Sequence, residues 1–429
     1  MHEASPKTVK PFEIDRWLIQ RAWLKVRENR GSAGIDKETI RQFDEHRADN
    51  LYKLWNRMSS GCYMPMAVRL VEIPKPNGGK RPLGIPSVTD RIAQQAAVMY
   101  IEPSLDPVFH PDSYAYRPNR SAHDAIAKAR SRCFQYAWVL DMDISKFFDT
   151  IDHELLMKAV RLHVTERWVL LYIERWLKVP YQMADGRQVE RTMGVPQGSV
   201  IGPVLANLFL HYVFDKWMQI HHYDIPFERY ADDTICHCRT REQAERLKAE
   251  LVARFEQCNL KLNEEKTKIV YCPTSNRPKQ DGDAPEEFDF LGFTFRARGA
   301  RNVKQQVTFT SFLPAISKKS LMKIRDKVRS WELHRLIQKP IQYVAAEMSL
   351  YTRGWINYYS RFGRSEFQQV MVYLNVTIAR WVKRKYKRFH RRHLFHAFQW
   401  LQRVSEHEPA LFQHWQCGYL PTHAPNGMR

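Results

Sequence analysis

The chain has 429 residues, 44% of them hydrophobic, which is enough material for two or three domain cores rather than one. No run of about 18 or more apolar residues occurs, so the sequence predicts no transmembrane helix, and the N-terminus resembles neither a secretory signal nor a transit peptide. These features indicate a cytoplasmic protein, and the net charge of +21 favours a polyanionic partner.

The first 60 residues are predicted to be helical, with a break at residues 31–34, where the sequence is Gly-Ser-Ala-Gly. A second helix is expected around residues 37–58. The first helix has an apolar stripe that consists of Trp17, Ile19, Ala22, Trp23 and Val26.

A basic hairpin is predicted next, with strands at residues 68–74 and 81–86 joined by a turn at residues 75–80. Lys75 and Arg81 flank this turn on paired strands, where both cations could reach one triphosphate. A solvated hairpin tip without a ligand is the alternative interpretation.

Aromatic and cationic residues then alternate over residues 113–120, a composition typical of template and nucleotide contacts, and Arg117 lies in this stretch. Helices are predicted from Arg91 and over residues 121–132, 152–178, 200–217 and 241–258.

The first acidic candidate, Asp143, lies where an apolar strand beginning at Trp138 runs into a turn. A second acidic group is the sequence Tyr-Ala-Asp-Asp at residues 230–233, which is predicted to be the tip of a hairpin. Surface turns often contain aspartate, so either group alone is weak evidence for a site. Together they supply one carboxylate from a strand end and two from a hairpin tip.

That set of carboxylates matches the minimum protein contribution to two-metal phosphoryl transfer, in which paired ions stabilise the attacking and leaving oxygens. Magnesium suits this chemistry because it needs only one or two carboxylates besides water and substrate phosphates. The neighbouring Cys-His-Cys sequence at residues 236–238 is not interpreted as a zinc site, because a strand would direct the sulfurs and the imidazole to opposite faces. The seven cysteines are scattered without a C-x-x-C pair, which argues against a disulfide framework.

Five sequence blocks, in this order, resemble those of the group II intron-encoded reverse transcriptase/maturase family, and the resemblance spans nearly the whole chain. The blocks are Gly-Ser-Ala-Gly-Ile-Asp (31–36), Ile-Pro-Lys-Pro-Asn-Gly-Gly-Lys-Arg-Pro-Leu-Gly-Ile-Pro (73–86), Tyr-Ala-Tyr-Arg-Pro (114–118), Gly-Val-Pro-Gln-Gly-Ser (194–199) and Tyr-Ala-Asp-Asp (230–233).

The resemblance implies an α+β right-hand polymerase: fingers and a palm with an antiparallel split βαββαβ sheet, followed by a helical thumb and maturase domain. The expected domains are an N-terminal extension (1–60), fingers and palm (61–314), the thumb and maturase domain (315–400) and a C-terminal tail (401–429). A hairpin at residues 288–295 is expected to hold the primer strand.

By the same resemblance, Asp143, Asp232 and Asp233 are the catalytic carboxylates, and Asp143, Ile144, Asp232 and Asp233 hold two Mg²⁺ ions, with Mn²⁺ as an alternative. The residues implied in nucleotide binding are Lys75, Arg81, Phe148 and Gln197. Phe148, five positions after Asp143, is preferred to Phe147 as the ring that excludes a ribose 2′-hydroxyl. Lys266 is implied near phosphate, with a solvent-facing lysine as an equally good interpretation.

The last quarter of the chain carries most of the excess charge, because residues 315–429 contain 21 Lys and Arg against 6 Asp and Glu. Such a segment is the footprint of a phosphate-backbone partner. Three basic helices are expected there, from residue 321, from residue 341 and over residues 366–387. Lys318, Lys319, Lys383 and Arg384 are the predicted nucleic-acid contacts, and residues 354–359 and 381–388 resemble a segment that binds structured intron RNA.

The expected partners are an RNA template with a DNA or RNA primer, dNTPs and a host group II intron RNA, and the expected activities are DNA synthesis, maturase-assisted splicing and retrohoming. Since the chain ends at Arg429 with no Cys/His-containing endonuclease signature, target-strand cleavage is not expected. Two alternatives remain: a domesticated reverse transcriptase in DNA repair or defence, and an RNA-binding splicing factor with a vestigial polymerase. The oligomeric state is not predicted.

Overall fold

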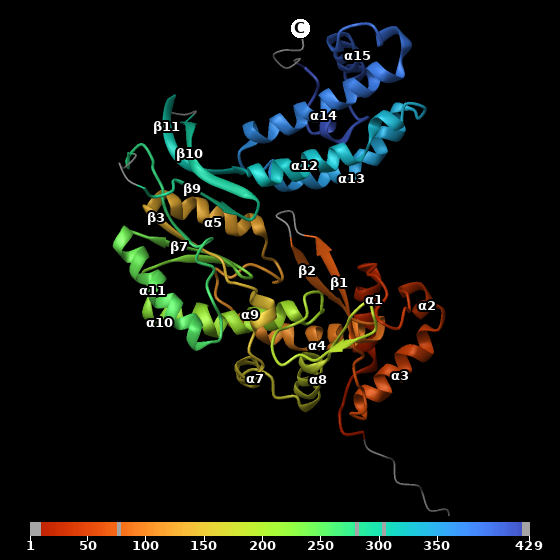
Figure 1. Cartoon of the computed structure of the whole chain (residues 1–429), viewed down its shortest axis with the longest axis vertical. Coiled ribbons are helices and arrows are strands. Elements are labelled where there is room, and N and C mark those ends of the chain that lie inside the picture. The colour runs from red at the N-terminus through yellow and green to blue at the C-terminus, as the bar shows by residue number, and fades with distance from the viewer. Residues whose placement is uncertain (1–9, 75–78, 279–282, 303–305, 423–429) are drawn as a thin grey trace, which may run out of the picture. The chain divides into compact units, whose positions relative to one another are not determined.

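The computed structural model describes residues 10–74, 79–278, 283–302 and 306–422 (Figure 1). The chain forms two compact units. Unit 1 comprises residues 1–125 and 140–269, and unit 2 comprises residues 126–139 and 270–429. In the parts of the chain described, no helix is both long and apolar enough to cross a membrane.

Unit 1 begins with helices that pack on one another through apolar faces. Asp15 caps the first helix by accepting a hydrogen bond from the backbone N–H of Trp17, and the predicted stripe of this helix is buried except for Trp17. The helix expected at residues 37–58 is divided into two at His46. The helices are α1 (Arg16–Glu28), α2 (Ile40–Glu45), α3 (Arg47–Ser59) and α4 (Val88–Leu105), with the 3₁₀ helix η1 (Asp106–Val108) after α4.

Helices α1 and α3, in the stretch expected to be an N-terminal extension, both pack on α4 within unit 1. The predicted basic hairpin forms as two antiparallel strands, β1 (Val68–Pro74) and β2 (Lys80–Ile85), with Ile73 opposite Arg81. Two short strands complete a sheet of order β2-β1-β4-β5. They are β4 (Tyr181–Gln182) and β5 (Gln188–Val189).

A second sheet has the order β6-β7-β3-β8, and β6 and β7 form the predicted hairpin. The division between the units passes through this sheet, since it falls after Val139 in β3 and after Ile269 in β8. The strands are β3 (Trp138–Met142), β6 (Phe227–Tyr230), β7 (Asp233–Cys238) and β8 (Lys268–Tyr271).

The remaining helices of unit 1 surround the chain segments that carry the acidic residues. They are α6 (Phe147–Thr150), α7 (His153–Arg161), α8 (Arg167–Lys178), α9 (Gly202–Leu210), the π-helix η2 (His211–Asp215), α10 (Lys216–His221) and α11 (Arg241–Gln257). The single helix predicted at residues 200–217 is therefore interrupted by a π-turn. Phe214 of that turn packs on Phe227 of β6, with ring centroids 4.9 Å apart.

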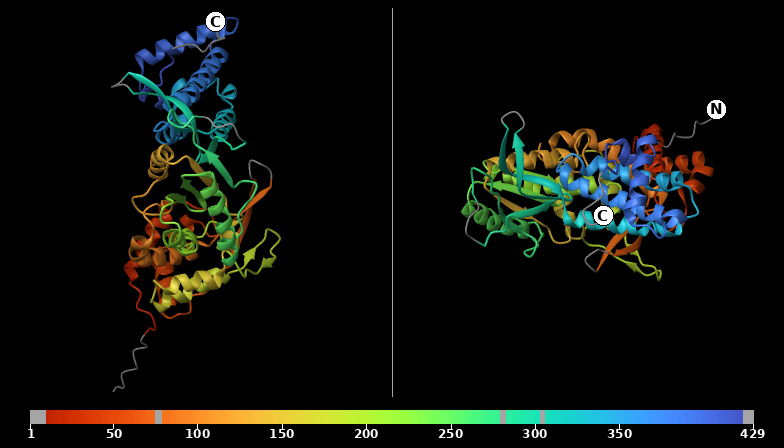
Figure 2. Two further views of the ribbon diagram at one scale, coloured as in Figure 1. Left: turned by 90° about the vertical axis from the view of Figure 1, so that its left-hand side faces the viewer. Right: turned by 90° about the horizontal axis from the view of Figure 1, so that it is seen from above.

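Unit 2 contains a three-stranded antiparallel sheet of order β11-β10-β9. Its strands are β9 (Glu287–Phe290), β10 (Phe293–Asn302) and β11 (Val307–Ile316). The hairpin predicted at residues 288–295 is thus the start of a longer ribbon, which is seen from two further directions in Figure 2. Phe288 and Phe295 stack across β9 and β10 with centroids 4.8 Å apart and hold the register.

The helices of unit 2 enclose one hydrophobic core. They are α12 (Lys318–Ser330), η3 (Leu333–Arg335), α13 (Ile341–Tyr359), α14 (Arg364–Lys385), η4 (Lys387–Phe389), α15 (Leu394–His407) and α16 (Gln413–Gln416). Helix α5 (Ala122–Gln135) crosses the division between the units.

Two predicted domain boundaries differ from this arrangement. The boundary at residue 314 falls inside β11, whose end packs on α14, so the β9–β11 sheet belongs with the helices that follow it. The boundary at residue 400 falls inside α15, and the expected tail is packed, because Leu401, Phe412 and Trp415 are each at most 2% exposed. Apolar side chains at these positions are buried in the core of unit 2.

Candidate active site and nucleic-acid interface

The acidic hairpin tip of unit 1 is a two-residue turn, because Tyr230 of β6 pairs with Asp233 of β7. Ala231, in the turn, has a φ of 59°, in the left-handed region. That conformation costs a residue with a side chain roughly 1–2 kcal/mol, so surrounding contacts must stabilise it.

Arg229 supplies that support from inside the protein. Its guanidinium is fully buried and makes two hydrogen bonds to the carboxylate of Asp215, of 2.7 and 2.6 Å. It also donates to the side-chain oxygen of Asn207 at 3.1 Å and to the carbonyl of Ala231 at 3.3 Å. Burial acts to raise the pKa of Asp215, but the charge and hydrogen bonds of Arg229 outweigh it and leave that pKa lowered.

Asp143 follows the end of β3, and its backbone is fixed by the turn at residues 261–267. The amide of Asn263 donates to the carbonyl of Asp143 at 2.8 Å, and the amide of Ser145 donates to the carbonyl of Lys261 at 2.8 Å. Ile144, predicted as a metal ligand, is buried and forms an isolated bridge with Leu262. The backbone around Asp143 is thereby held in place.

Lys266 comes from the same turn and pairs with Asp143. Its Nζ lies 3.0 Å from Oδ2 of Asp143, and both side chains are partly open to solvent. The lysine predicted near phosphate therefore places its positive charge on one of the predicted metal-binding carboxylates.

Asp232 belongs to the same electrostatic cluster. Burial raises the pKa of its carboxyl, the negative charge of Asp143 raises it further, and the positive charges of Arg81 and Lys266 lower it. These electrostatic interactions connect the hairpin tip with Asp143 at the end of β3, Arg81 of β2 and Lys266 of the 261–267 turn.

The donor chemistry of this cluster fits a hard divalent cation, because two carboxylates that raise each other's energy are relieved by a positive ion. Asp233, on β7 beside the turn, adds a third carboxylate from the chain. Across the described residues, however, no three His, Cys, Asp or Glu side chains are grouped closely enough to form a metal site as they stand.

Gln197 connects the basic hairpin to this region. Its side-chain oxygen accepts a hydrogen bond from Nε of Arg81 at 2.6 Å, and its side-chain nitrogen donates to Asp149 at 3.2 Å. The amide of Gly84 donates to the carbonyl of Gln197 at 2.7 Å. Gly198 has a φ of 108°, and a Cβ there would lie 2.5 Å from the carbonyl of Gly84, so glycine is required.

The two phenylalanines after Asp143 have different surroundings. Phe147 is 2% exposed and packs against Phe209 of α9, whereas Phe148 is only partly buried. The carbonyl of Phe148 accepts from the amide of Val195 at 2.7 Å, which joins α6 to the segment that carries Gln197.

Two further residues of unit 1 were predicted to contact nucleotide or nucleic acid. Lys75 lies outside the described residues. Arg117 has a nearly buried side chain, which pairs with Asp106 at 2.7 Å and donates to the carbonyls of His110 and Ser113. Its guanidinium is engaged inside the fold, which argues against the predicted contact with nucleic acid.

Three residues of unit 1 were missed by the sequence prediction. Asp149 bonds to Gln197, Arg229 supports the hairpin tip, and Tyr116 lies near Asp232, whose negative charge adds to burial in raising the tyrosine pKa. Tyr116 stood in a block that resembles the family, so a closer reading of that block could have found it. No sequence signal distinguishes Asp149 or Arg229 from ordinary surface charges.

The Cys-His-Cys segment on β7 is buried, as predicted. Nε2 of His237 lies 2.5 Å from the carboxylate of Glu228 on β6. Burial raises the pKa of the Cys238 thiol to about 12, so that cysteine is an inert thiol.

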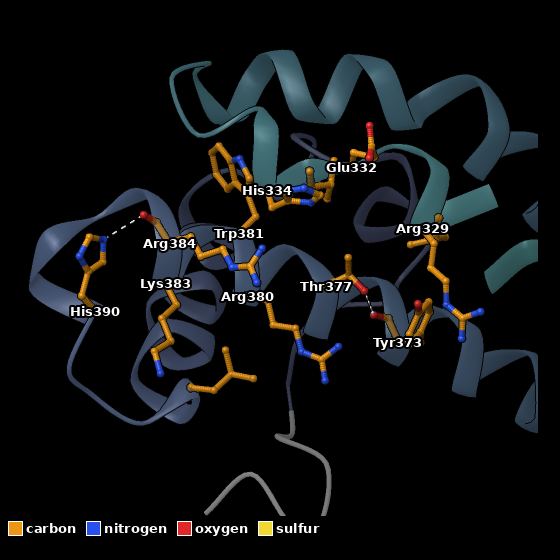
Figure 3. A pocket seen from close by; sticks show the side chains of 13 residues that line it. Arg329, Glu332, His334, Tyr373, Thr377, Arg380, Trp381, Lys383, Arg384 and His390 are labelled. Carbon is orange, nitrogen blue, oxygen red and sulfur yellow. Dashed lines mark hydrogen bonds between the residues drawn. The ribbon is translucent and has the colours of Figure 1, made fainter. Parts of the chain in front are cut away.

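In unit 2, the four predicted cations lie on helices. Lys318 and Lys319 are exposed in the first turn of α12, where Lys319 approaches Asp289 at 3.7 Å. Lys383 and Arg384 are in the last turn of α14 and line a pocket (Figure 3). In the segment 354–359, which was predicted to bind intron RNA, Tyr358 donates a hydrogen bond to the carbonyl of Leu291 at 2.8 Å.

Comparison with protein families gives two matches. Residues 73–295 match the model described as reverse transcriptase (RNA-dependent DNA polymerase), and residues 321–398 match the group II intron, maturase-specific domain. The first match covers the end of β1, all of β2, both acidic segments and Gln197.

Curated proteins with similar sequences include Protein YkfC of Escherichia coli, which is 31% identical over 68% of this chain and 84% of its own length. The group II intron-encoded protein LtrA of Lactococcus lactis is 34% identical over 44% of this chain, and that alignment covers 32% of LtrA. A putative COX1/OXI3 intron 1 protein of Saccharomyces cerevisiae is 30% identical over 48% of this chain and 24% of its own length.

Proposed function

We propose that this chain, which belongs to the reverse transcriptase family and carries a group II intron maturase-specific domain, extends a primer with Asp143 and Asp232 at the reacting centre. Membership of the family makes it an RNA-directed DNA polymerase. The main support for this active site is the electrostatic cluster of Asp143, Asp232, Arg81 and Lys266.

Asp143 and Asp232 would hold divalent ions, Mg²⁺ by preference and Mn²⁺ as the alternative, with Asp233 and the backbone at Ile144 beside them. Bound ions of this kind lower the pKa of an attacking hydroxyl and neutralise charge on a leaving pyrophosphate. The protein contributes fixed positions: Arg229 holds the hairpin tip through Ala231, and the 261–267 turn holds Asp143. Lys266 moves off Asp143 when a stronger cation binds there.

Arg81 and Gln197 bind the incoming nucleotide in this proposal. They are already joined by a 2.6 Å hydrogen bond, so a cation and an amide are positioned together before a triphosphate arrives. Lys75, on the same hairpin, is proposed as a second cation for the triphosphate. In polymerase terms, β1 and β2 belong to the fingers and the β6-β7-β3-β8 sheet to the palm.

Unit 2 is proposed as the thumb and maturase region, with Lys318, Lys319, Lys383 and Arg384 as contacts to nucleic acid. The match to the maturase-specific domain over residues 321–398 and the positive charge of residues 315–429 support this role. The RNA partner would be a host group II intron, whose folding and splicing the protein assists, and whose mobility depends on DNA synthesis.

The direct test is primer extension with Mg²⁺ on a poly(rA)/oligo(dT) substrate beside the same primer on poly(dA). We expect extension on the RNA template that stops when the ion is chelated. Extension that persists in excess chelator would contradict the metal-dependent site.

The sugar-excluding role proposed for Phe148 has a separate test. Replacing Phe148 by alanine should raise incorporation of ribonucleotides relative to deoxyribonucleotides by roughly 10-fold or more, because the ring no longer opposes a 2′-hydroxyl. Phe147→Ala is the comparison, and it should instead lower stability, because Phe147 is in the core. A gain in ribonucleotide use with Phe147→Ala alone would transfer the role to that residue.

A further inference from the structure

A pocket in unit 2 combines an apolar floor with positively charged walls. Its volume is about 710 Å³, which is within the range of small-molecule sites. The lining includes three aliphatic side chains, Val328, Leu333 and Leu394, which are called the apolar floor here. Residues of α14 from Tyr373 to Arg384 line one side of the pocket (Figure 3). All the residues that line it belong to the region matched by the maturase-specific domain.

The cations of α14 share one face of the helix. Arg380, Lys383 and Arg384 stand three and four positions apart, which places their side chains beside one another. Like charges at this spacing repel each other by a few tenths of a kcal/mol per pair. An external anion would relieve this repulsion.

No internal acid neutralises these cations. Among the described residues, none of Arg380, Lys383 and Arg384 forms an ion pair at 4.0 Å or less. Glu332 also lines the pocket, but its carboxylate pairs with Arg335 at 2.8 Å. The wall therefore presents positive charge that the protein itself leaves uncompensated.

The floor distinguishes this pocket from a site for phosphate alone. A phosphate group needs donors and charge, whereas an apolar floor of this size fits the flat surface of a nucleobase. Tyr373 also lines the pocket, and its half-buried aromatic ring lies on the same wall of α14, one turn before Thr377 and two turns before Arg380.

We infer that this pocket receives a single unpaired nucleotide of an RNA strand, with its base over the apolar floor and its phosphates on Arg380, Lys383 and Arg384. The inference rests on the proposed binding of structured RNA by unit 2. It specifies further that the bound RNA contains an unpaired nucleotide. A nucleotide turned out of a helix exposes both its base and its flanking phosphates, which a paired nucleotide does not.

The test compares two RNA hairpins of the same stem, one with a single-nucleotide bulge and one fully paired, bound to the full chain. We expect the bulged hairpin to bind roughly 10-fold more tightly, which corresponds to about 1.4 kcal/mol. The Arg380→Gln/Arg384→Gln variant should lose this preference. Arg391→Gln/Arg392→Gln removes the same charge at exposed positions that do not line the pocket, and it should keep the preference.

A second variant separates shape from charge. Thr377→Phe fills the pocket without changing charge, and it should abolish the preference for the bulge while leaving the salt dependence of binding unchanged. Equal binding of the two hairpins by the unaltered chain would overturn the inference. So would competition by free ATP at concentrations that also displace the bulged hairpin, because the pocket would then be a site for free nucleotides.

Failure of this inference and failure of the polymerase proposal give different results. Extension on poly(rA)/oligo(dT) by the unaltered chain reports only on the site in unit 1. Absence of the bulge preference in the unaltered chain, with extension intact, would remove the pocket inference alone. A bulge preference without extension would remove the polymerase assignment alone.

Discussion

The two units handle their charged residues in opposite ways. In unit 1, Arg229 is completely buried, and its guanidinium donates four hydrogen bonds to Asp215, Asn207 and the backbone of the hairpin tip. In unit 2, Arg380, Lys383 and Arg384 line an open pocket without an acidic partner among the described residues. Charges paired internally fix the positions of other groups, whereas charges left unpaired are available to a polyanion.

Removing a single charge from the reacting centre should have the largest effect. Asp232→Asn keeps the size of the side chain but removes a carboxylate from the cluster with Asp143, so primer extension should fall roughly 10,000-fold, about 5 kcal/mol of transition-state stabilisation. RNA binding, measured by filter retention, should change little. Asp185→Asn in the exposed β4–β5 turn is the matched control and should extend primers normally. Parallel loss of both activities would identify the hairpin tip as a structural element only.

The second largest effect is expected on stability, from replacing Arg229, the buried partner of Asp215. Arg229→Met leaves Asp215 buried without its counter-charge, which should lower the free energy of unfolding of unit 1 by about 3–5 kcal/mol in urea titrations. Adding Asp215→Leu should restore part of the loss, because the unpaired charge is then gone. Arg384→Met, at an exposed position of unit 2, should change stability by about 0.5 kcal/mol or less. Equal costs for the two arginine substitutions would erase the contrast between the units.

Lowering the pH should change the stability contributions of two buried residues, one in each unit, in opposite directions. Burial lowers the pKa of His414 in unit 2 to about 3, while burial raises the pKa of Asp90 in unit 1 to about 6. His414 binds fewer protons when the protein is folded. Its contribution to the free energy of unfolding is therefore fully present above its unfolded pKa of about 6.5 and is lost as the pH falls below that value. Asp90 binds more protons when the protein is folded. Its contribution to the free energy of unfolding is therefore lost as the pH rises through about 6.

The measurement is unfolding by urea between pH 7 and pH 5. The stability advantage of the unaltered chain over His414→Gln should shrink by about 2 kcal/mol as the pH falls. The advantage over Asp90→Asn should grow over the same range. A pH-independent difference for the histidine variant would mean that His414 has the same pKa in the folded and unfolded states, in spite of its burial and its 2.8 Å contact with Asn375.

Exposed cations of unit 2 should have the smallest individual effects. Lys318→Gln/Lys319→Gln should weaken RNA binding several-fold and reduce the slope of log K against log salt by about 1.4, or about 0.7 for each lost phosphate contact. Lys158→Gln, an exposed lysine on α7 of unit 1, is the control and should leave the slope unchanged. An unaltered slope in the double variant would exclude these lysines from the RNA contact.

Local pattern was enough to predict the strands that carry the site. The alternating residues after Asp233 predicted β7, and the Lys- and Gly-rich turn predicted the β1–β2 hairpin. Resemblance to a family then placed Asp143, Asp232 and Gln197 in one site, which no spacing in the sequence could do, because they are brought together by long-range folding.

The sequence was less informative where the packing partners of a residue are distant along the chain. It was also less informative for aromatic residues, which can either stack on nucleic acid or be buried in a core. Residues 381–388 were expected to bind structured RNA, yet Trp381 within this segment is 1% exposed and belongs to the core. Composition cannot distinguish a stacking platform from a buried ring. The expected tail began at residue 401, inside α15, because the local sequence does not show that Leu401 and the residues after it pack on helices far along the chain.

The π-turn at residues 211–215 has a consequence for how the chain tolerates insertions and deletions. In a regular α-helix, Asn207 and Asp215 would project about 80° apart, since eight residues advance the helix by about 800°. The additional residue that a π-turn accommodates reduces this offset to roughly 20°, so both side chains face the guanidinium of Arg229. Deletion of one residue here would convert the π-turn to regular α-helix and keep both side chains on one face, whereas a regular α-helix of the present length would turn Asp215 away. This segment should therefore tolerate a one-residue deletion better than a one-residue insertion.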